Sequence, residues 1–351
     1  MSDPAHEATD KIIARIEKAL SKEYRLAHKE IAEKLDDYLR RYELKDKKWR
    51  EWVKSGRKTK EEYKKWQIGQ VMSGKRWAEM KENLAQDYVN VHHIAQNIAN
   101  SGMAEVYAIN HNFGTYEIEH GAQLGTSYTL YDKNTVERIW RENPKLYPRP
   151  GRAMQQAIRD GKVKRWCKRQ IQSVITQGII QGDSIVSLAK RLEAVSGGEH
   201  KAAIRNARTM ATGVENAGRM DAYRRANMMG IETEKVWLAA LDSRTRHWHR
   251  MLDGVKKPVE EPFINDFGKI MYPGDPEARG ANIYNCRCTL LSSIKGFSID
   301  LHDPKVRPMD SLGNMTYEEW KKETRSTSNP ITRQEEISKM MKAVYLREYR
   351  R

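Results

Sequence analysis

One histidine and two cysteines stand among charged residues in the C-terminal half of the chain. Cys286 and Cys288 are two residues apart, and side chains at i and i+2 of a strand point to the same face. Zinc accepts two thiolates together with an imidazole, which His249 can supply. Asp242 or Asp275 offers a fourth ligand. One interpretation of these residues is therefore a zinc site.

A simpler interpretation needs no metal. Structural zinc sites usually contain a C-x₂-C pair, and C-x-C is an uncommon spacing. Charge-assisted hydrogen bonds among Asp242, Arg244, Arg246 and Asp253 would fix the turns of a small module. His249 and the two cysteines would then pack in its centre. We expect no catalytic residues, because no established spacing of nucleophile and base appears, and no cofactor other than zinc.

The elements that must position these residues are predicted to form a small α+β module over 231–295. The letters E-T-E-K-V-W-L-A alternate like a strand. Asp242 and Ser243 offer an N-cap for a short helix over 244–252, and Asp253-Gly254 marks a turn. Strands are then predicted within 263–272 and over 282–291.

The N-terminal 150 residues are predicted to be helical. Apolar residues three or four apart form one helical stripe over 8–44, consisting of Ile13, Ile16, Leu20, Tyr24, Ala27, Ile31, Leu35 and Tyr38. Thr59 and Glu62 have the spacing of a capping box at the start of a second helix. Gly74 is expected to break that helix before a third. Within 101–131 we expect a small hairpin.

Helices are also predicted for the central part of the chain, residues 151–230. Asn134 is expected to cap a short helix before a cluster of prolines, which places a boundary near 150. Gly197 and Gly198 are expected to end one central helix, and Gly230 the next. The small residues over 203–218 would allow close helix packing. Cys167 is expected to be structural, with a reactive thiol as the alternative.

A mainly α fold follows from these patterns, with a long helical N-terminal and central region and a small C-terminal α+β module. The remaining residues, 296–351, are predicted to form a tail with a helix over 333–350.

The charge of the chain limits its partners. It has 351 residues, with 63 Lys and Arg against 47 Asp and Glu, a formal charge of +16. This excess favours anionic partners such as nucleic acid, although a basic surface without a specific ligand is the alternative. Three cysteines give no disulfide framework and indicate a reducing compartment. No signal peptide or transmembrane segment is expected.

Five short motifs of the module resemble the signature of the MuF-type minor head proteins of tailed double-stranded DNA phages. The motif residues are Asp242, Arg244, Thr245, Arg246, His249, Asp253, Gly254, Pro273, Gly274, Asp275, Pro276, Asn285, Cys286, Arg287 and Cys288. The helix over 203–226 is also similar to the segment that precedes this signature. The resemblance covers about residues 160–295. The family often has His or Pro before N-C-R-C, where this chain has Ile283-Tyr284.

The resemblance implies a non-enzymatic role in head assembly. Such proteins lie in the capsid interior near the portal, are made in the host cytoplasm and can leave the head with the DNA. The implied partners are the portal protein, the scaffold or major capsid protein and packaged double-stranded DNA, with no membrane during assembly. No fused enzyme is expected after the module. The alternatives are a metal-dependent enzyme acting on nucleic acid or a host protein, and a non-specific DNA-binding protein.

Overall fold

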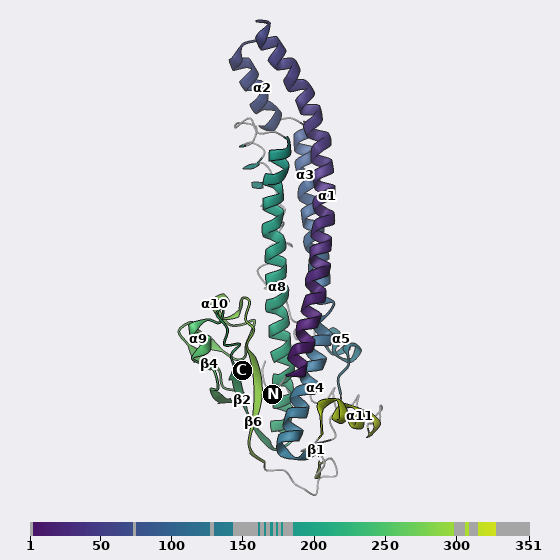
Figure 1. Ribbon diagram of the computed structural model, residues 1–351, viewed down its shortest axis with the longest axis vertical. Coiled ribbons are helices and arrows are strands. Elements are labelled where there is room, and N and C mark those ends of the chain that lie inside the picture. The colour runs from purple at the N-terminus through teal and green to yellow at the C-terminus, as the bar shows by residue number, and fades with distance from the viewer. Residues whose placement is uncertain are drawn as a thin grey trace. The chain divides into compact units, whose positions relative to one another are not determined.

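The chain folds mainly into helices (Figure 1). The computed structural model describes residues 3–72, 75–126, 130–142, 161, 165, 169–170, 173–174, 177, 185–297, 306–308 and 315–327. It divides into two compact units. Unit 1 comprises Met1–Ile12, Met103–Pro148 and Thr209–Arg351, and unit 2 comprises Ile13–Gly102 and Arg149–Arg208. All strands of the described residues lie in unit 1, so the predicted mainly α fold with a small α+β region is confirmed.

The two units interleave along the sequence, whereas the predicted boundaries at 150, 230 and 295 are consecutive. Those boundaries remain predictions. None of the helices in the described part of the chain is long and apolar enough to span a bilayer.

Unit 2 is built from long helices. It contains most of α1 (Pro4–Lys54), all of α2 (Lys60–Met72) and α3 (Lys75–Asn100), and the first part of α8 (Ile185–Met228). The apolar stripe of α1 is confirmed where side chains are described, because Ile16, Leu20, Tyr24 and Ile31 are buried. Within this unit Arg208 of α8 pairs with Glu17 of α1. Apolar burial and this pairing hold α1 against α8.

The start of α2 confirms the predicted capping box. The backbone amide of Glu62 donates to Thr59 Oγ1 at 3.1 Å, and the amide of Thr59 donates to Glu62 Oε2 at 2.9 Å. The predicted break at Gly74 and the predicted helix over 333–350 lie outside the described residues, as does Cys167.

The hairpin predicted within 101–131 is wrong. This stretch forms α4 (Met103–Ala122), which β1 (Leu124–Thr126) follows. Polar side chains, among them Asn110 and Glu119, are buried in α4, so its apolar residues show no clear helical periodicity. Strand β1 pairs with the distant β7 (Val306–Pro308) instead of with a neighbouring strand.

Two predicted helix ends are also wrong. The first turn of α5 (Lys133–Glu142) is capped by Asp132, whose Oδ1 accepts from the amide of Thr135 at 2.7 Å, and not by Asn134. Helix α8 continues through Gly197 and Gly198. Each interior glycine costs a helix about 1 kcal/mol relative to alanine, and the helix-forming residues on both sides offset that cost. Gly230, with φ +91°, follows the end of α8 as predicted.

Glycines allow α4 and α8 to pack closely within unit 1. A Cβ atom on Gly218 of α8 would lie 2.6 Å from the carbonyl oxygen of Tyr107 in α4. A Cβ on Gly114 of α4 would meet Ala222 Cβ at 3.2 Å. The predicted role of small residues over 203–218 in helix packing is confirmed at Gly218, and Gly114 adds a close approach that was not predicted.

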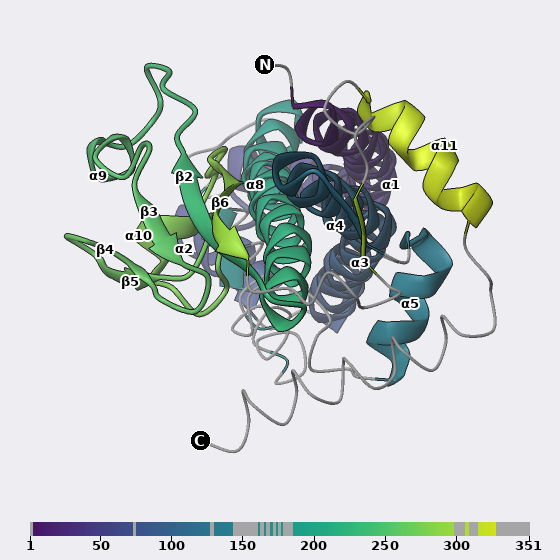
Figure 2. The same ribbon diagram turned by 90° about the horizontal axis from the view of Figure 1, so that it is seen from below.

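The α+β module lies beside the C-terminal part of α8 in unit 1 (Figures 1 and 2). Its central strand β2 (Ile231–Leu238) pairs antiparallel with β3 (Lys256–Pro258) and β6 (Thr289–Phe297). A separate hairpin joins β4 (Phe263–Asn265) and β5 (Gly268–Ile270). Strand β2 and the strand-turn-strand segment within 263–272 are confirmed.

Three details of the module differ from the prediction. The short helix α9 spans only His247–Arg250, and neither Asp242 nor Ser243 caps it. The strand predicted over 282–291 begins only at Thr289, after helix α10 (Gly280–Ile283) and an irregular segment. Asn285, with φ +53°, interrupts extended backbone at this point.

One helix of the C-terminal region was not predicted. Helix α11 (Tyr317–Thr327) begins with a capping box, in which the amide of Thr316 donates to Glu319 Oε2 at 2.8 Å. The buried indole of Trp320 donates to Glu119 of α4 at 2.5 Å. These bonds attach α11 to α4 within unit 1.

A buried network joins the first turn of α1 to α8 within unit 1. Arg219 is fully buried and donates to Asp3 at 2.6 Å. His6 Nδ1 lies 2.7 Å from Glu215 Oε1, and this hydrogen bond raises the pKa of His6 from 6.5 to about 9. The imidazole of His6 is therefore charged at neutral pH.

Replacing His6 by glutamine should make a pH-dependent part of the stability disappear. A raised folded-state pKa contributes stability that is fully present below about pH 6.5 and is lost as the pH rises through about 9. The stability difference between the wild type and His6→Gln should be about 2 kcal/mol at pH 6 and close to zero at pH 10, measured by urea unfolding. A difference that is the same at both pH values would contradict the charged imidazole of His6.

Candidate functional site

One face of α8 binds the backbone and side chains of the segment that carries the cysteines. This α8 polar face consists of Thr209, Thr212, Glu215, Asn216 and Arg219. Their spacings of three and four residues place them on one side of the helix. All of them except Thr209 are buried.

Residues of the α8 polar face form hydrogen bonds along the segment 285–290. Thr212 Oγ1 donates to the carbonyl oxygen of Cys286 at 2.7 Å, and Arg219 donates to that of Leu290 at 2.8 Å. Asn216 Oδ1 accepts from the amide of Leu290 at 2.9 Å. Further bonds join Asn285 N to Thr209 Oγ1, Thr289 Oγ1 to Glu215 and Asn216 Nδ2 to the Cys288 carbonyl oxygen. Side chains of α8 thus satisfy backbone groups that would otherwise be buried without partners.

The motif P-G-D-P packs its backbone directly against α8. Gly274 has φ +80°, and a Cβ atom there would lie 2.5 Å from the amide nitrogen of Gly213. Asp275 closes the turn, because its carboxylate accepts from the amides of Met271 and Glu277 at 2.9 Å. Pro273 and Pro276 flank these two residues in the sequence. Only glycine fits at positions 213 and 274 without a shift of backbone.

Asp242 organises the loop before α9. Its Oδ1 accepts from Arg287 at 2.7 Å and from the amide of Arg244 at 2.9 Å, and the second oxygen also contacts Arg287. Thr245 Oγ1 donates to the same carboxylate at 3.0 Å. The Arg287 pairing is the main cause that holds the pKa of Asp242 well below its usual range. Nearby, Arg246 donates to the carbonyl oxygen of Tyr284.

The Asp253-Gly254 turn ties the end of this loop to β2. Asp253 Oδ1 accepts from the amide of Ala239 at 2.8 Å, and the amide of Gly254 donates to the carbonyl oxygen of Trp237 at 2.8 Å. Gly254 has φ +72°, which favours glycine. Asp242 and Asp253 therefore help to fix the loops of the module, and the arginine that pairs with Asp242 by hydrogen bonds is Arg287, which the simpler interpretation did not include.

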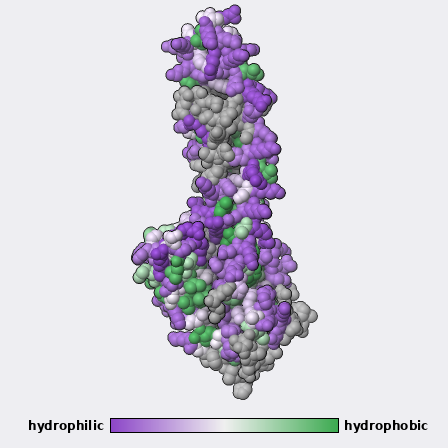
Figure 3. All heavy atoms as spheres, viewed as in Figure 1, coloured by the Kyte–Doolittle hydropathy of each residue, from purple (hydrophilic) through white to green (hydrophobic). Residues whose placement is uncertain are grey.

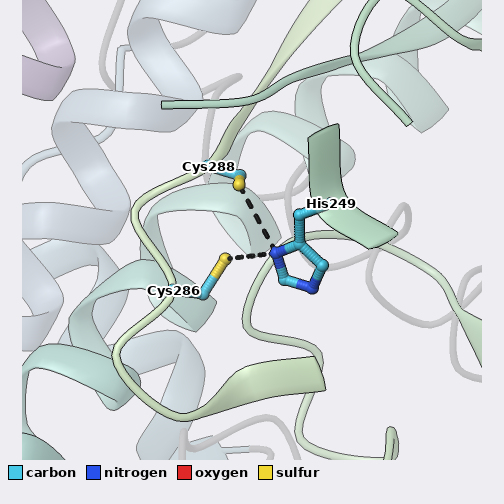
Figure 4. A group of neighbouring side chains, drawn as sticks. All are labelled: His249, Cys286 and Cys288. Atoms are coloured by element: carbon cyan, nitrogen blue, oxygen red, sulfur yellow. Dashed lines mark hydrogen bonds between the residues drawn. The ribbon is translucent and has the colours of Figure 1, made fainter. Parts of the chain in front are cut away.

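His249, Cys286 and Cys288 meet in the core of the module. His249 Nδ1 lies 3.6 Å from each Sγ atom, as Figure 4 shows. All three side chains are buried, and the ring of His249 packs edge-on against Trp237 with 5.2 Å between centroids. The contact with Cys286 is the main cause that lowers the pKa of Cys288, and the reciprocal contact raises that of Cys286.

The predicted fourth ligands do not join this group. Among the described residues the only cluster of metal-binding type is His249, Cys286 and Cys288. The carboxylates of Asp242 and Asp275 bind Arg287 and backbone amides instead.

Sequence inspection missed the residues that hold the site in place. Thr212, Asn216 and Arg219 are polar residues at helical spacing in α8, and that spacing was the available signal. Lys235 was missed too, because an alternating strand gives no hint of a buried amine. Its Nζ donates to the carbonyl oxygens of Val259 and Met271 at 2.9 Å, and burial lowers its pKa to about 7.

Comparison with known proteins finds a similar family for one part of the chain. Residues 169–291 match the family described as Phage Mu protein F like protein. Over these residues the chain is similar to the MuF-type family of phage minor head proteins. The matched residues include the α8 polar face, the P-G-D-P turn and both cysteines.

Two relatives extend the comparison. The chain is 27% identical over 255 residues to the Minor head protein GP7 of Bacillus phage SPP1, a match that covers 71% of this chain and 77% of the relative. It is 30% identical over 147 residues to a protein of Enterococcus faecalis named NAD(+)–arginine ADP-ribosyltransferase EFV. That match covers 42% of this chain and only 30% of the enzyme's length. No solved structure matches the chain.

Adding a methyl group at Gly274 should destabilise the module far more than adding one at Gly254. Both glycines have positive φ, so alanine costs about 1 kcal/mol of backbone strain at either position. Only Gly274 faces the backbone of α8, which adds about 2 kcal/mol for overpacking. Urea unfolding followed by tryptophan fluorescence should therefore show losses of about 1 kcal/mol for Gly254→Ala and about 3 kcal/mol for Gly274→Ala. Equal losses would show that the turn does not press against α8.

Proposed function

We propose that this protein acts inside the phage head during assembly, with unit 2 contacting packaged DNA and unit 1 binding the proteins of the portal vertex. The match of residues 169–291 to the MuF-type family and the similarity to a phage minor head protein support the head-assembly role. The different roles proposed for the two units follow from the distribution of charge between them.

All of the net charge of the chain lies in unit 2. Unit 2 carries 34 Lys and Arg against 18 Asp and Glu, whereas unit 1 carries 29 of each, so the whole formal charge of +16 falls in unit 2. Figure 3 shows mostly hydrophilic residues over the described helices of unit 2 on the face that it draws. This separation of charge is the observation that carries the proposal.

A basic helical unit suits contact with packaged DNA. Phosphate neutralisation by Lys and Arg releases counterions and needs no recognition of sequence, which is the requirement inside a head filled with arbitrary genome segments. Lys45, Lys47 and Lys48 of α1 and Lys64 of α2 are exposed and available for such contacts. The same charge would help the protein to travel with the DNA when the genome leaves the head.

Unit 1 suits contact with protein. It has no net charge, and its module exposes large apolar side chains, which Figure 3 shows as hydrophobic areas. Leu241, Met251, Ile264 and Tyr284 are 60%, 68%, 65% and 46% exposed. Apolar and aromatic side chains dominate the centres of protein interfaces, so this surface fits the portal, scaffold or major capsid protein.

We propose no enzymatic activity. The relative named as an ADP-ribosyltransferase shares only 30% of its length with this chain, so its activity gives no argument for transferase activity here. The motif residues with catalytic chemistry, Asp242, Asp253 and Asp275, are engaged in turn-forming hydrogen bonds.

A complementation experiment with matched charge variants tests the proposal. In a phage that lacks this coding sequence, the wild-type protein should restore infectious particles. A variant with Lys45, Lys47, Lys48 and Lys64 changed to glutamine should restore at least tenfold fewer, because unit 2 loses phosphate contacts. The control changes the same number of exposed lysines of unit 1 to glutamine, Lys133, Lys269, Lys295 and Lys322, and should restore wild-type numbers.

The salt dependence of DNA binding by the purified variants tests which unit contacts the DNA. The slope of log affinity against log salt concentration should fall by about 0.9 for each phosphate contact that the unit 2 variant loses, and should not change in the unit 1 variant. Normal particle numbers without the protein would contradict a head-assembly role. Equal slopes for the two variants would contradict the assignment of DNA contact to unit 2.

A further inference from the structure

The geometry of the histidine-cysteine cluster points to a zinc ion bound by His249, Cys286 and Cys288. This site goes beyond head assembly, and its test does not depend on that role. The three ligand atoms lie within 4.8 Å of one another. Figure 4 shows both sulfur atoms facing the same ring nitrogen, Nδ1.

The distances fit a shared ion better than a hydrogen bond. Zinc lies about 2.3 Å from thiolate sulfur and about 2.0 Å from imidazole nitrogen, so tetrahedral angles place the two ligand atoms about 3.5 Å apart. Both Sγ atoms lie 3.6 Å from His249 Nδ1. A neutral imidazole nitrogen accepts only one hydrogen bond, whereas one ion accounts for both equal distances.

The C-x-C spacing works here because the backbone is irregular. Residues 286–288 do not form a strand, and Asn285 with φ +53° turns the chain just before them. Their carbonyl groups are fixed by Thr212 and Asn216 of α8. Both sulfur atoms therefore approach His249 from a segment that is already held in position.

The three proposed ligands are buried, and their donor atoms favour zinc. The exposed fractions of His249, Cys286 and Cys288 are only 1%, 2% and 2%. Two thiolates and one imidazole bind zinc in preference to the hard cations magnesium and calcium, which bind oxygen ligands. Among the described residues no fourth protein ligand joins the group, so the proposed site is defined by these three side chains.

The ion would link two parts of the module that are distant in sequence. His249 belongs to α9, in the loop between β2 and β3, and the cysteines precede β6. His249 Nε2 has no hydrogen-bond partner among the described residues, so the bond at Nδ1 would determine how the ring is oriented. The ion would fix the loop that carries the Asp242 and Asp253 turns.

Metal analysis of the full chain, purified under reducing conditions and supplied with zinc, tests the site. The wild type should hold about one zinc ion per chain, whereas His249→Gln, Cys286→Ser and Cys288→Ser should fall to background. The controls are His247→Gln, which changes the exposed histidine of α9, and Cys167→Ser, and both should keep the ion. A wild type without zinc, or a His249→Gln variant that keeps it, would overturn the proposal.

Cobalt substitution of the wild-type protein gives a readout that does not require the variants to fold. The expected spectrum has a thiolate-to-cobalt charge-transfer band and the intense visible bands of tetrahedral cobalt. Removal of the ion by a chelator should lower the midpoint of thermal unfolding. A spectrum of octahedral cobalt without thiolate bands, or a wild-type protein whose mass shows a disulfide and no metal, would contradict a zinc site.

Discussion

Hydrogen bonds from one face of α8 to the segment 285–290 hold the module in this structure. Thr212, Asn216 and Arg219 reach carbonyl and amide groups that an irregular segment leaves without strand partners. A buried backbone group without a partner costs about 1–3 kcal/mol, so losing several of them together would remove much of the stability of a small domain. The close approach of Gly213 and Gly274 depends on the same helix, because it brings the P-G-D-P turn against α8. The shape of the module is thus determined by a helix that precedes it in the sequence.

The aspartates of the motifs have a structural part in this module. Asp242, Asp253 and Asp275 have the chemistry of catalytic groups, yet each binds backbone amides that close a turn. The site therefore has the features of a rigid building block. Such a block suits the proposed role in head assembly, since binding to a partner is strongest when the surface is already ordered before contact. The proposed DNA contact of unit 2 would need neither a fixed pocket nor a fixed sequence.

The sequence was sufficient for elements whose pattern is local. The apolar stripe of α1, the capping box at Thr59 and the alternation in β2 all predicted the observed structure. It was insufficient where tertiary contacts override local preference. Helix α4 buries Asn110 and Glu119, whose partners Thr9 and Trp320 are distant in sequence, so its periodicity was hidden.

The candidate site was likewise only partly predictable from the sequence. The sequence singled out His249, Cys286 and Cys288, and the structure brings them together. Their positions could not be derived from a strand pattern, because Asn285 breaks the extended backbone and the α8 polar face supplies the contacts instead. Thr212 and Asn216 are ordinary helix residues until the backbone groups that they bind are known.

Native-state hydrogen exchange of the full chain tests the role of α8 most directly. The amide of Leu290 donates to Asn216, so its exchange should require the same opening as the amides over 212–219 of α8. Both sets should then exchange with one free energy and respond equally to denaturant. The account would be contradicted if the Leu290 amide exchanged through a much smaller opening, together with the β4–β5 hairpin, while α8 stayed protected.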